Sequence, residues 1–393
     1  MLARRLDNIE SSPTLAITAR VAELRARGVD VIGFGAGEPD FPTPAPIVEA
    51  AVAALREGFT RYTPSRGIPE LREAISRKLE RDNGLAYDPG EIVVSCGAKH
   101  AMFNALMALC SEGDEVVVPA PYWVSYPHMA RLAGAEPVIV PTSEDEGFKL
   151  TPAALEAAIT PRTKAVIINS PANPTGAVYT RDELHALASL CVERGVWIIS
   201  DEIYEKLLYE GEHHSVAALD PAFRDYTVTV NGVSKAYSMT GWRMGYSASP
   251  RELADAISRV QDHSTSCIAS FVQKACVAAF ELDDSVVDAM RAEFDKRRRR
   301  MVELLDGLPG VSCRMPHGAF YAFAGIRRLI GRKIAGREVK SSMDFARIAL
   351  DEARVAVVPG SAFGAEGYIR LSYAVSLDTI ERGLARLAEL LRS

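Results

Sequence analysis

Short apolar runs alternate with amphipathic segments through the first two thirds of the chain. The runs are rich in Val and Ile, and they predict strands at 91–95, 115–118, 136–140, 164–169, 196–200 and 226–230. Apolar positions at helical spacing predict helices at 14–27, 46–57, 69–82, 100–110, 122–132, 152–159, 180–194 and 251–262. Strands that alternate with helices predict an α/β fold, in which a mostly parallel sheet is covered by helices on both faces.

The pattern changes near residue 300. A helical region at 271–304 leads into predicted strands at 311–315, 318–323, 355–358 and 368–374, with helices at 342–353 and 378–391. A chain of 393 residues is also longer than one hydrophobic core usually supports. We therefore predict an N-terminal arm and part of a small domain at 1–45, a large domain at 46–295, and a smaller α+β domain at 296–393.

The composition is that of an ordinary soluble protein. Hydrophobic residues make up 48%, charged residues make up 24%, and the formal net charge is −6. This acidic balance disfavours a nucleic-acid partner, so we interpret the basic run 296–300 as a solvated helix face or domain edge. The N-terminus lacks an apolar signal core, and no apolar run approaches about 18 residues, which disfavours a membrane partner and indicates a cytoplasmic protein.

Neither the cysteines nor the histidines have the spacing of a metal site. The six cysteines are scattered without a Cys-x-x-Cys pair, which favours reduced thiols. His213 and His214 lie in a polar loop, and no Asp, Glu or Cys ligand pattern accompanies them. We therefore expect no bound metal.

Reactive and charged residues follow the ends of several predicted strands. Asn173 lies in the loop after the strand 164–169, Asp201 and Tyr204 follow the strand 196–200, and Lys235 follows the strand 226–230. Because the carboxyl ends of parallel strands meet at one edge of a sheet, we expect these side chains to lie together. A lone loop lysine is ordinarily a surface charge, so the interpretation of Lys235 depends on its neighbours.

Three further features suit an anionic ligand. The turn Gly97-Ala98, between a strand and a helix, can present backbone N–H groups to a phosphate, although such turns also occur without a ligand. Arg370 interrupts an apolar strand, where a buried arginine favours a carboxylate. Arg243 follows Lys235 in the same polar segment. Together these groups suit a phosphorylated aromatic aldehyde that forms a Schiff base with a lysine.

A more specific resemblance rests on an ordered set of segments. They are 35–41 (GAGEPDF), 61–72, 121–127 (PYWVSYP), 173–176 (NPTG), 200–204 (SDEIY), 234–243 (SKAYSMTGWR) and 370–374 (RLSYA). Over essentially its whole length, the sequence resembles the class I aminotransferases of pyridoxal 5′-phosphate fold type I. The resemblance implies transamination with this cofactor bound in the large domain, and a homodimer with shared active sites.

The resemblance also implies a role for each matching residue. Lys235 would bind the cofactor aldehyde and then carry the substrate proton, and Asp201 would pair with the pyridinium nitrogen. The remaining cofactor contacts would be Tyr204 and Asn173 at the ring oxygen, Trp123 against the ring, Gly97, Ala98, Ser234 and Arg243 at the phosphate, and Tyr62 from the neighbouring subunit. The substrate pocket would be formed by Arg370 at the α-carboxylate, together with Gly37, Trp123 and Asn173.

Two residues bear on the substrate. Lys99 follows the phosphate turn and Thr14 begins the predicted N-terminal helix, and both match positions that hold a distal carboxylate in the prokaryotic aspartate aminotransferase branch. A lysine at a helix start is unfavourable against the helix dipole, which favours a local anion, whereas Thr14 is equally suited to be a plain N-cap. We expect L-aspartate and 2-oxoglutarate to give oxaloacetate and L-glutamate. Prephenate stays open as a second substrate, because relatives with this residue pair act on it.

Other substrates stay open for a local reason. His100 and the segment 262–266 differ from the residues expected of close relatives. An aromatic, kynurenine-like or other specialised substrate is therefore the alternative, and a lyase or decarboxylase of the same fold is a further one.

Overall fold

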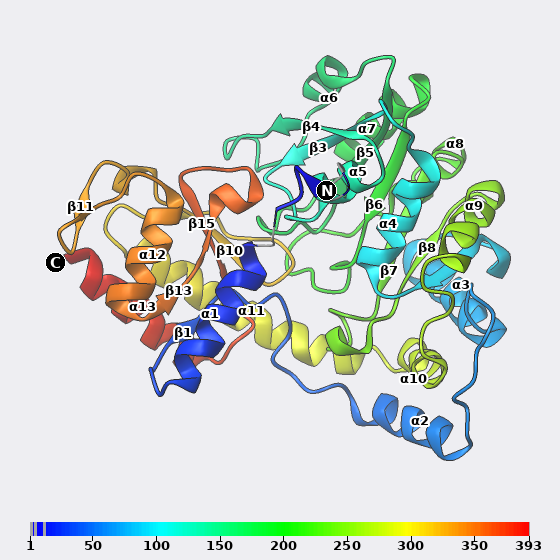
Figure 1. Ribbon diagram of the computed structural model, residues 1–393, viewed down its shortest axis with the longest axis horizontal. Helices are drawn as coiled ribbons and strands as arrows, with labels where there is room; N and C mark the ends of the chain where they lie inside the picture. Colours follow the sequence, from blue (N-terminus) through cyan, green and yellow to red (C-terminus); the bar gives the residue numbers. More distant parts are fainter. Residues whose placement is uncertain (1–2, 4–5, 11–12, 393) are drawn as a thin grey trace.

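A computed structural model describes residue 3, residues 6–10 and residues 13–392. Its main feature is a seven-stranded sheet of order β2-β8-β7-β6-β5-β3-β4 (Figure 1). Only β8 is antiparallel to its neighbours in this sheet, so the predicted α/β fold with a mostly parallel sheet is confirmed. The strands are β2 (Ile92–Ser95), β3 (Glu115–Ala120), β4 (Glu136–Pro141), β5 (Thr163–Asn169), β6 (Trp197–Asp201), β7 (Thr227–Gly232) and β8 (Gly245–Ala248).

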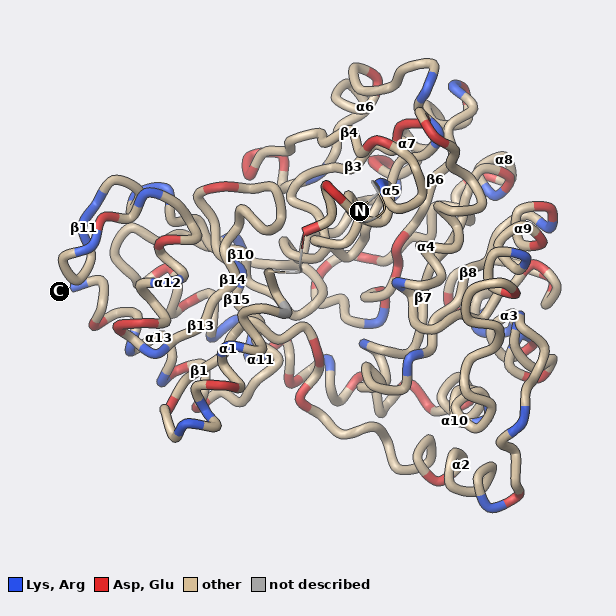
Figure 2. Tube along the Cα trace, viewed as in Figure 1, with Lys and Arg blue, Asp and Glu red and all other residues tan. Residues whose placement is uncertain are grey.

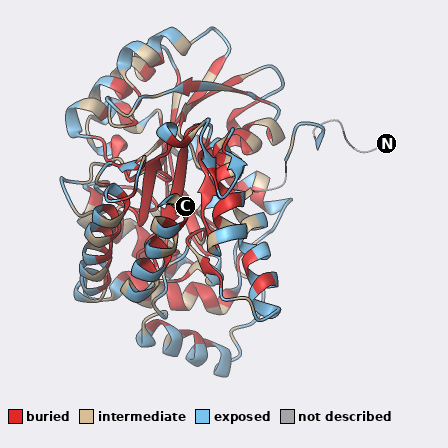
Figure 3. Ribbon diagram, turned by 90° about the vertical axis from the view of Figure 1, so that its left-hand side faces the viewer, coloured by how far each residue is buried: buried red, intermediate tan, exposed pale blue. Residues whose placement is uncertain are grey.

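Helices cover both faces of this sheet, so its central strands are buried and their sequences are continuous apolar runs rather than alternating ones (Figure 3). Every residue of β2 and β7 is buried. The helices of this part are α2 (Ala45–Arg56), α3 (Pro69–Asn83), α4 (Ala98–Leu109), α5 (Tyr126–Leu132), α6 (Pro152–Ala158), α7 (Arg181–Glu193), α8 (Pro221–Arg224), α9 (Arg251–Asp262) and α10 (Ser270–Glu281).

A second sheet, of order β14-β15-β10-β9, lies beside the large one (Figure 1). The short pairs β1-β13 and β11-β12 accompany it, and β1 ties the N-terminal segment to this part of the molecule. The strands are β1 (Ile32–Gly33), β9 (Ser312–Cys313), β10 (Tyr321–Gly325), β11 (Lys333–Ile334), β12 (Arg337–Glu338), β13 (Val355–Ala356), β14 (Val358–Pro359) and β15 (Tyr368–Ser372). The helices are α1 (Pro13–Ala26), α11 (Ser285–Asp306), α12 (Ser342–Ala353) and α13 (Leu377–Arg392). Short 3₁₀ helices occupy Pro89–Glu91, Val216–Ala218, Thr240–Trp242, Arg327–Leu329 and Gly360–Phe363.

The differences from the predicted elements have local causes. Strand β8 was not predicted, because four residues containing Gly and Ser give no readable alternation. The helix predicted from residue 122 begins at Tyr126, because a turn closes first, in which the Tyr126 N–H donates to the Trp123 carbonyl. The helical region 271–304 is two helices, and Asp283 separates them by accepting a hydrogen bond from the Ser285 N–H.

The interpretation of the basic run 296–300 as a solvated helix face or domain edge is wrong for two of its residues. Arg297 and Arg298 lie on the inner face of α11 and are buried. Arg297 Nη1 lies 2.7 Å from Asp40 Oδ1, and Arg298 Nη2 lies 2.8 Å from Glu210 Oε1, so carboxylates from distant segments offset the buried charges. Figure 2 shows acidic and basic residues interspersed along the chain rather than separated by sign. Among the described residues, no helix combines the length and the apolar character needed to cross a lipid bilayer.

Candidate active site

A cavity of about 350 Å³ opens between the carboxyl edge of the large sheet and the part built on the second sheet. This size is in the range of small-molecule sites. It is lined by all the predicted site residues except Gly97 and Tyr62, namely Thr14, Gly37, Ala98, Lys99, Trp123, Asn173, Asp201, Tyr204, Ser234, Lys235, Arg243 and Arg370. The expectation that Asn173, Asp201, Tyr204 and Lys235 lie together is therefore confirmed.

Lys235 lies beyond the end of β7 and crosses the cavity towards the N-terminal segment. Its Nζ donates a hydrogen bond to the Gly37 carbonyl at 2.6 Å, and it lies 5.9 Å from the centre of the Tyr204 ring. Burial lowers the pKa of Lys235 to about 8; the Glu38 and Asp201 carboxylates oppose this shift, and the charges of Arg243 and Arg370 add to it. An amine with this pKa is partly neutral near pH 7 and can act as a nucleophile or base.

Asp201 ends β6 and is 5% exposed. The Tyr126 hydroxyl donates to its Oδ2 at 2.7 Å, and the Ile203 N–H donates to its Oδ1 at 3.3 Å. Burial raises the pKa of Asp201 to about 6, and these two hydrogen bonds oppose the rise. The carboxylate forms no ion pair within the described part of the chain, so it suits a cationic atom of a ligand.

The turn between β2 and α4 forms the anion-binding end of the cavity. Gly97 has φ 86, and a Cβ atom there would press on the Arg243 guanidinium, so glycine is needed both for the backbone and for the approach of the arginine. Arg243 Nη1 donates to the Thr240 carbonyl at 2.8 Å. Ala98 and Ser234 line the adjoining wall. The N-terminus of α4 and an arginine without a carboxylate partner in the described residues together suit a phosphate.

Arg370 on β15 is 3% exposed and faces the cavity from the second sheet. Nη1 donates to Asn173 Oδ1 at 3.0 Å, Nη2 donates to the Gly35 carbonyl at 2.9 Å, and Nε has no hydrogen-bond partner among the described residues. The guanidinium lies 4.3 Å from the centre of the Tyr321 ring. Neutral oxygens orient Arg370 but leave its charge without an anion, which suits a ligand carboxylate.

Lys99 and Thr14 lie at the rim. Lys99 Nζ lies 4.9 Å from the centre of the Trp123 ring, and burial together with Arg243 lowers the pKa of Lys99. Helix α1 begins at Pro13, so Thr14 lies inside the first turn and is not the N-cap that the sequence left open. Tyr62 lies outside the lining of the cavity and is 94% exposed.

Sequence reasoning missed several residues that the fold brings to the site. Tyr126 is hydrogen-bonded to Asp201, and the Tyr321 hydroxyl lies 3.0 Å from the Tyr204 hydroxyl. Tyr126 could have been found, because it lies three residues after Trp123 in the segment 121–127 and packs edge-on against that ring. Tyr321 has no local signal, because it arrives from the second sheet.

Comparison with known proteins agrees with this geometry. The family model described as aminotransferase class I and II matches residues 29–387. The chain is 50% identical to the aspartate aminotransferase of Geobacillus stearothermophilus over 98% of each chain, and 49% identical to the probable aspartate/prephenate aminotransferase of Aquifex aeolicus over 99% of this chain and 98% of that protein.

Solved structures give the same result. The aspartate aminotransferase of Rhizobium meliloti superposes with a TM-score of 0.96 at 43% identity, covering 100% of this chain and 99% of that one. The aspartate aminotransferase of Thermus thermophilus with maleate superposes with a TM-score of 0.94 at 44% identity, covering 100% of both chains. The predicted family and enzyme class are confirmed: the chain belongs to the class I and II aminotransferase family.

Proposed function

We propose that this aminotransferase uses pyridoxal 5′-phosphate and transfers the amino group of L-aspartate to 2-oxoglutarate, giving oxaloacetate and L-glutamate. The charge of the cavity carries the proposal. Four cationic side chains line it, and within the described residues none of them forms an ion pair with a carboxylate: Lys99, Lys235, Arg243 and Arg370. Arg370 is buried and Lys235 is half-buried, whereas Lys99 and Arg243 are exposed. A buried cation without a carboxylate partner is costly, so anionic ligands would stabilise this site.

The donor set fits the proposed cofactor. Its phosphate would be held by the turn Gly97-Ala98, Ser234 and Arg243, and its aldehyde would be held by Lys235. Its protonated ring nitrogen would form an ion pair with the buried carboxylate of Asp201, which lacks a cationic partner among the described residues. Trp123, Tyr204 and Asn173 would contact the ring. When bound, pyridoxal 5′-phosphate supplies an acceptor for the electrons released at the substrate Cα.

The chain's own residues prepare the proton transfer. Lys235 Nζ is the base that would take the Cα proton, and the Gly37 carbonyl orients it. With a pKa of about 8, roughly a tenth of the amine is neutral at pH 7, against well under a thousandth for an ordinary lysine. Arg370 would hold the α-carboxylate, so the Cα proton faces the amine rather than the bulk water.

An acidic substrate is favoured by a second cation. With one carboxylate at Arg370, the side-chain carboxylate of aspartate can lie near Lys99 and Thr14, which line the same cavity. The Thermus thermophilus relative is described with maleate, a dicarboxylate. Prephenate is the second candidate, because the Aquifex aeolicus relative is named for it and the Trp123 ring beside Lys99 offers an apolar surface.

A donor panel tests the substrate. We expect L-aspartate to give the highest kcat/KM with 2-oxoglutarate, ahead of L-tyrosine and L-kynurenine, with prephenate tested as an alternative acceptor. Product analysis should find oxaloacetate, whereas fumarate with ammonia, or alanine with carbon dioxide, formed from aspartate in the absence of 2-oxoglutarate would indicate a lyase or a decarboxylase. Purified protein should show the visible absorption band of the lysine-linked cofactor, and Lys235→Ala should lose it. An unchanged band in that variant would overturn the proposed linkage.

We also propose a homodimer with shared active sites. Helix α2 exposes Val48, Val52 and Leu55 along one face, at 39%, 37% and 45%, and Tyr62 follows it in an extended, exposed loop. An apolar helix stripe of this kind is typical of a subunit contact. Mixing Lys235→Ala and Tyr62→Phe chains would rebuild one intact site per hybrid dimer. Activity should therefore rise above both parents, and a simple average would contradict shared sites.

The predicted division into 1–45, 46–295 and 296–393 suggests how the site closes. Gly37 follows β1 and Arg370 lies in β15, on the side of the second sheet, whereas Lys235 follows β7 and Asp201 ends β6 of the large sheet. Helix α11 crosses the boundary at 295/296, so it would be the hinge. We propose that substrate draws the two parts together, which small-angle scattering with and without maleate would detect. A cytoplasmic location, tested by cell fractionation, completes the proposal.

A further inference from the structure

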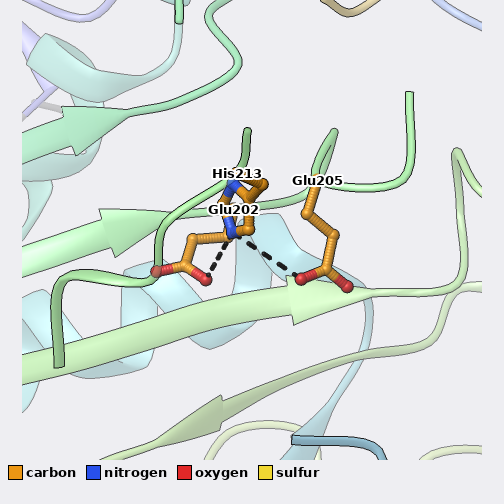
Figure 4. Close-up of side chains that lie close together, drawn as sticks. All are labelled: Glu202, Glu205 and His213. Carbon is orange, nitrogen blue, oxygen red and sulfur yellow. Dashed lines mark hydrogen bonds and ion pairs between the residues drawn. The ribbon is translucent and has the colours of Figure 1, made fainter. Parts of the chain in front are cut away.

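The segment after β6 presents side chains to two environments. Asp201 and Tyr204 line the cavity, whereas Glu202 and Glu205 do not and enter a buried polar cluster with His213 (Figure 4). His213 Nε2 lies 3.2 Å from Glu202 Oε2 and 3.8 Å from Glu205 Oε2. No acidic ligand pattern accompanies His213 in the sequence, but the loop that carries His213 folds back onto the end of β6 and brings it to the two glutamates.

The cluster is a closed network and not a vacant metal site. Each carboxylate oxygen of Glu202 and Glu205 already has a donor. For Glu202 the donors are Ser200 Oγ at 2.8 Å and Ser215 Oγ at 2.6 Å, and for Glu205 they are the Lys78 ammonium and Asn83 Nδ2, the latter at 2.7 Å. A metal cation would have to displace these donors and lie beside the charge of Lys78, which disfavours it.

The charges of the cluster balance only when His213 is protonated. Three carboxylates, those of Asp82, Glu202 and Glu205, face two lysines, Lys78 and Lys206. Burial alone would lower the pKa of His213, but the hydrogen bond and charge of Glu202, with the charge of Glu205, outweigh burial and raise it. Arg81 pairs with Asp82, and Asp284 pairs with Lys206, so these two further charges cancel. The hydroxyls of Tyr87, Tyr237 and Tyr246 also face the cluster.

The cluster acts on the cavity through the peptide that it anchors. Glu202 directly follows Asp201, and Glu205 directly follows Tyr204, so fixing the two glutamates fixes the turn between the two cavity residues. The Glu202 charge also acts on Asp201: burial raises the pKa of Asp201 first, and the negative charge of Glu202 raises it further. A protonated His213, on the side of Glu202 away from the cavity, offsets the negative charge of Glu202.

We propose that His213 is a positioning residue of the aminotransferase: through Glu202 and Glu205 it holds the Asp201–Tyr204 turn, and its positive charge keeps the Asp201 carboxylate ionised for the cofactor. This inference rests on the proposed function. It predicts that removing the imidazolium weakens cofactor binding most at acid pH, where Asp201 takes up a proton.

The test titrates apo-protein with pyridoxal 5′-phosphate between pH 6 and pH 9 and follows the visible band. His213→Gln leaves one carboxylate charge uncompensated, and its affinity relative to wild type should fall about fivefold more at pH 6 than at pH 9, because raising the pKa of Asp201 by one unit from about 6 lowers the ionised fraction at pH 6 from about a half to about a tenth. Glu202→Gln removes the opposing charge and should move the profile in the opposite direction. His214→Gln is the matched control, because His214 lies 3.9 Å from the exposed Glu212.

The outcomes separate the possible roles. A merely structural histidine would lower the melting temperature of His213→Gln without changing the pH dependence relative to wild type, and this result would overturn the inference. Shifts of the same sign in His213→Gln and Glu202→Gln would also overturn it. If His213→Gln does not fold, His213→Asn takes its place in the same comparison. A stoichiometric metal found in wild type and lost in His213→Gln would replace the inference with a metal site. Wild type without a visible band would instead refute the proposed function.

Discussion

The hydrogen bond from Tyr126 to Asp201 gives a prediction that can be worked out quantitatively. Tyr126→Phe removes the 2.7 Å bond to Asp201 Oδ2 and leaves the Ile203 N–H as the remaining donor to this carboxylate in the described residues. A hydrogen bond to a charged group contributes about 1.5–3 kcal/mol. At about 1.36 kcal/mol per pKa unit, its loss raises the pKa of Asp201 by roughly one to two units.

The sign of the effect follows from which form binds. Tyr126 stabilises the carboxylate, so its loss favours the neutral acid, and the pKa of Asp201 moves from about 6 in wild type towards roughly 7–8 in the variant. Only the carboxylate pairs with a protonated ring nitrogen. The ratio of the two dissociation constants for pyridoxal 5′-phosphate should therefore rise about 10- to 100-fold between pH 9 and pH 5. Comparing both proteins at each pH cancels the titrations of the cofactor itself.

The assay is the titration of apo-protein followed by the visible band. Tyr246→Phe is the control, because the Tyr246 hydroxyl is also buried but has no hydrogen-bond partner among the described residues. A ratio for Tyr126→Phe that stays flat from pH 5 to pH 9 would refute the reasoning, since it would show that the hydroxyl does not set the ionisation of Asp201.

Three shorter predictions concern the cations and the turn. Arg370→Gln should lower kcat/KM for aspartate about 30-fold or more, because a substrate carboxylate without its cation in a dry site loses at least about 2 kcal/mol of binding free energy. A change below about threefold would exclude Arg370 as the carboxylate partner. The rate at which apo-protein takes up the cofactor should rise through pH 8 as Lys235 loses its proton, since the pKa of this amine is about 8, and a rise only near pH 10 would contradict the burial argument. Gly97→Ala should release pyridoxal 5′-phosphate faster in a dilution assay while binding of phosphate-free pyridoxal changes little, because the new Cβ presses on Arg243. Gly113→Ala, at φ 92 with nothing within 4 Å, controls for backbone strain alone.

Much of the fold was readable because its signals are local. The apolar runs of β3, β5, β6 and β7 mark strands buried on both faces, and β–α alternation leads to a parallel sheet whose carboxyl edge collects the reactive residues. Strand β8 could not be predicted, because its four residues show no alternation of apolar and polar positions and it is stabilised by pairing with β2 and β7. Predicted element limits shifted by a few residues wherever turns and caps, not periodicity, decide where a helix begins.

By itself, the sequence determined the kinds of groups that meet at the strand ends: the amine of Lys235, the carboxylate of Asp201 and the turn at Gly97. Only the tertiary structure decided what surrounds them. The Tyr126 hydroxyl at Asp201, the carbonyl that orients Lys235 and the histidine behind Glu202 come from other segments of the chain, and no local pattern predicts these contacts. Ionisation depends on these neighbours, because burial and the nearest charges set the pKa of a group. Residue identity therefore indicated the chemistry, and packing set the protonation states that the chemistry needs.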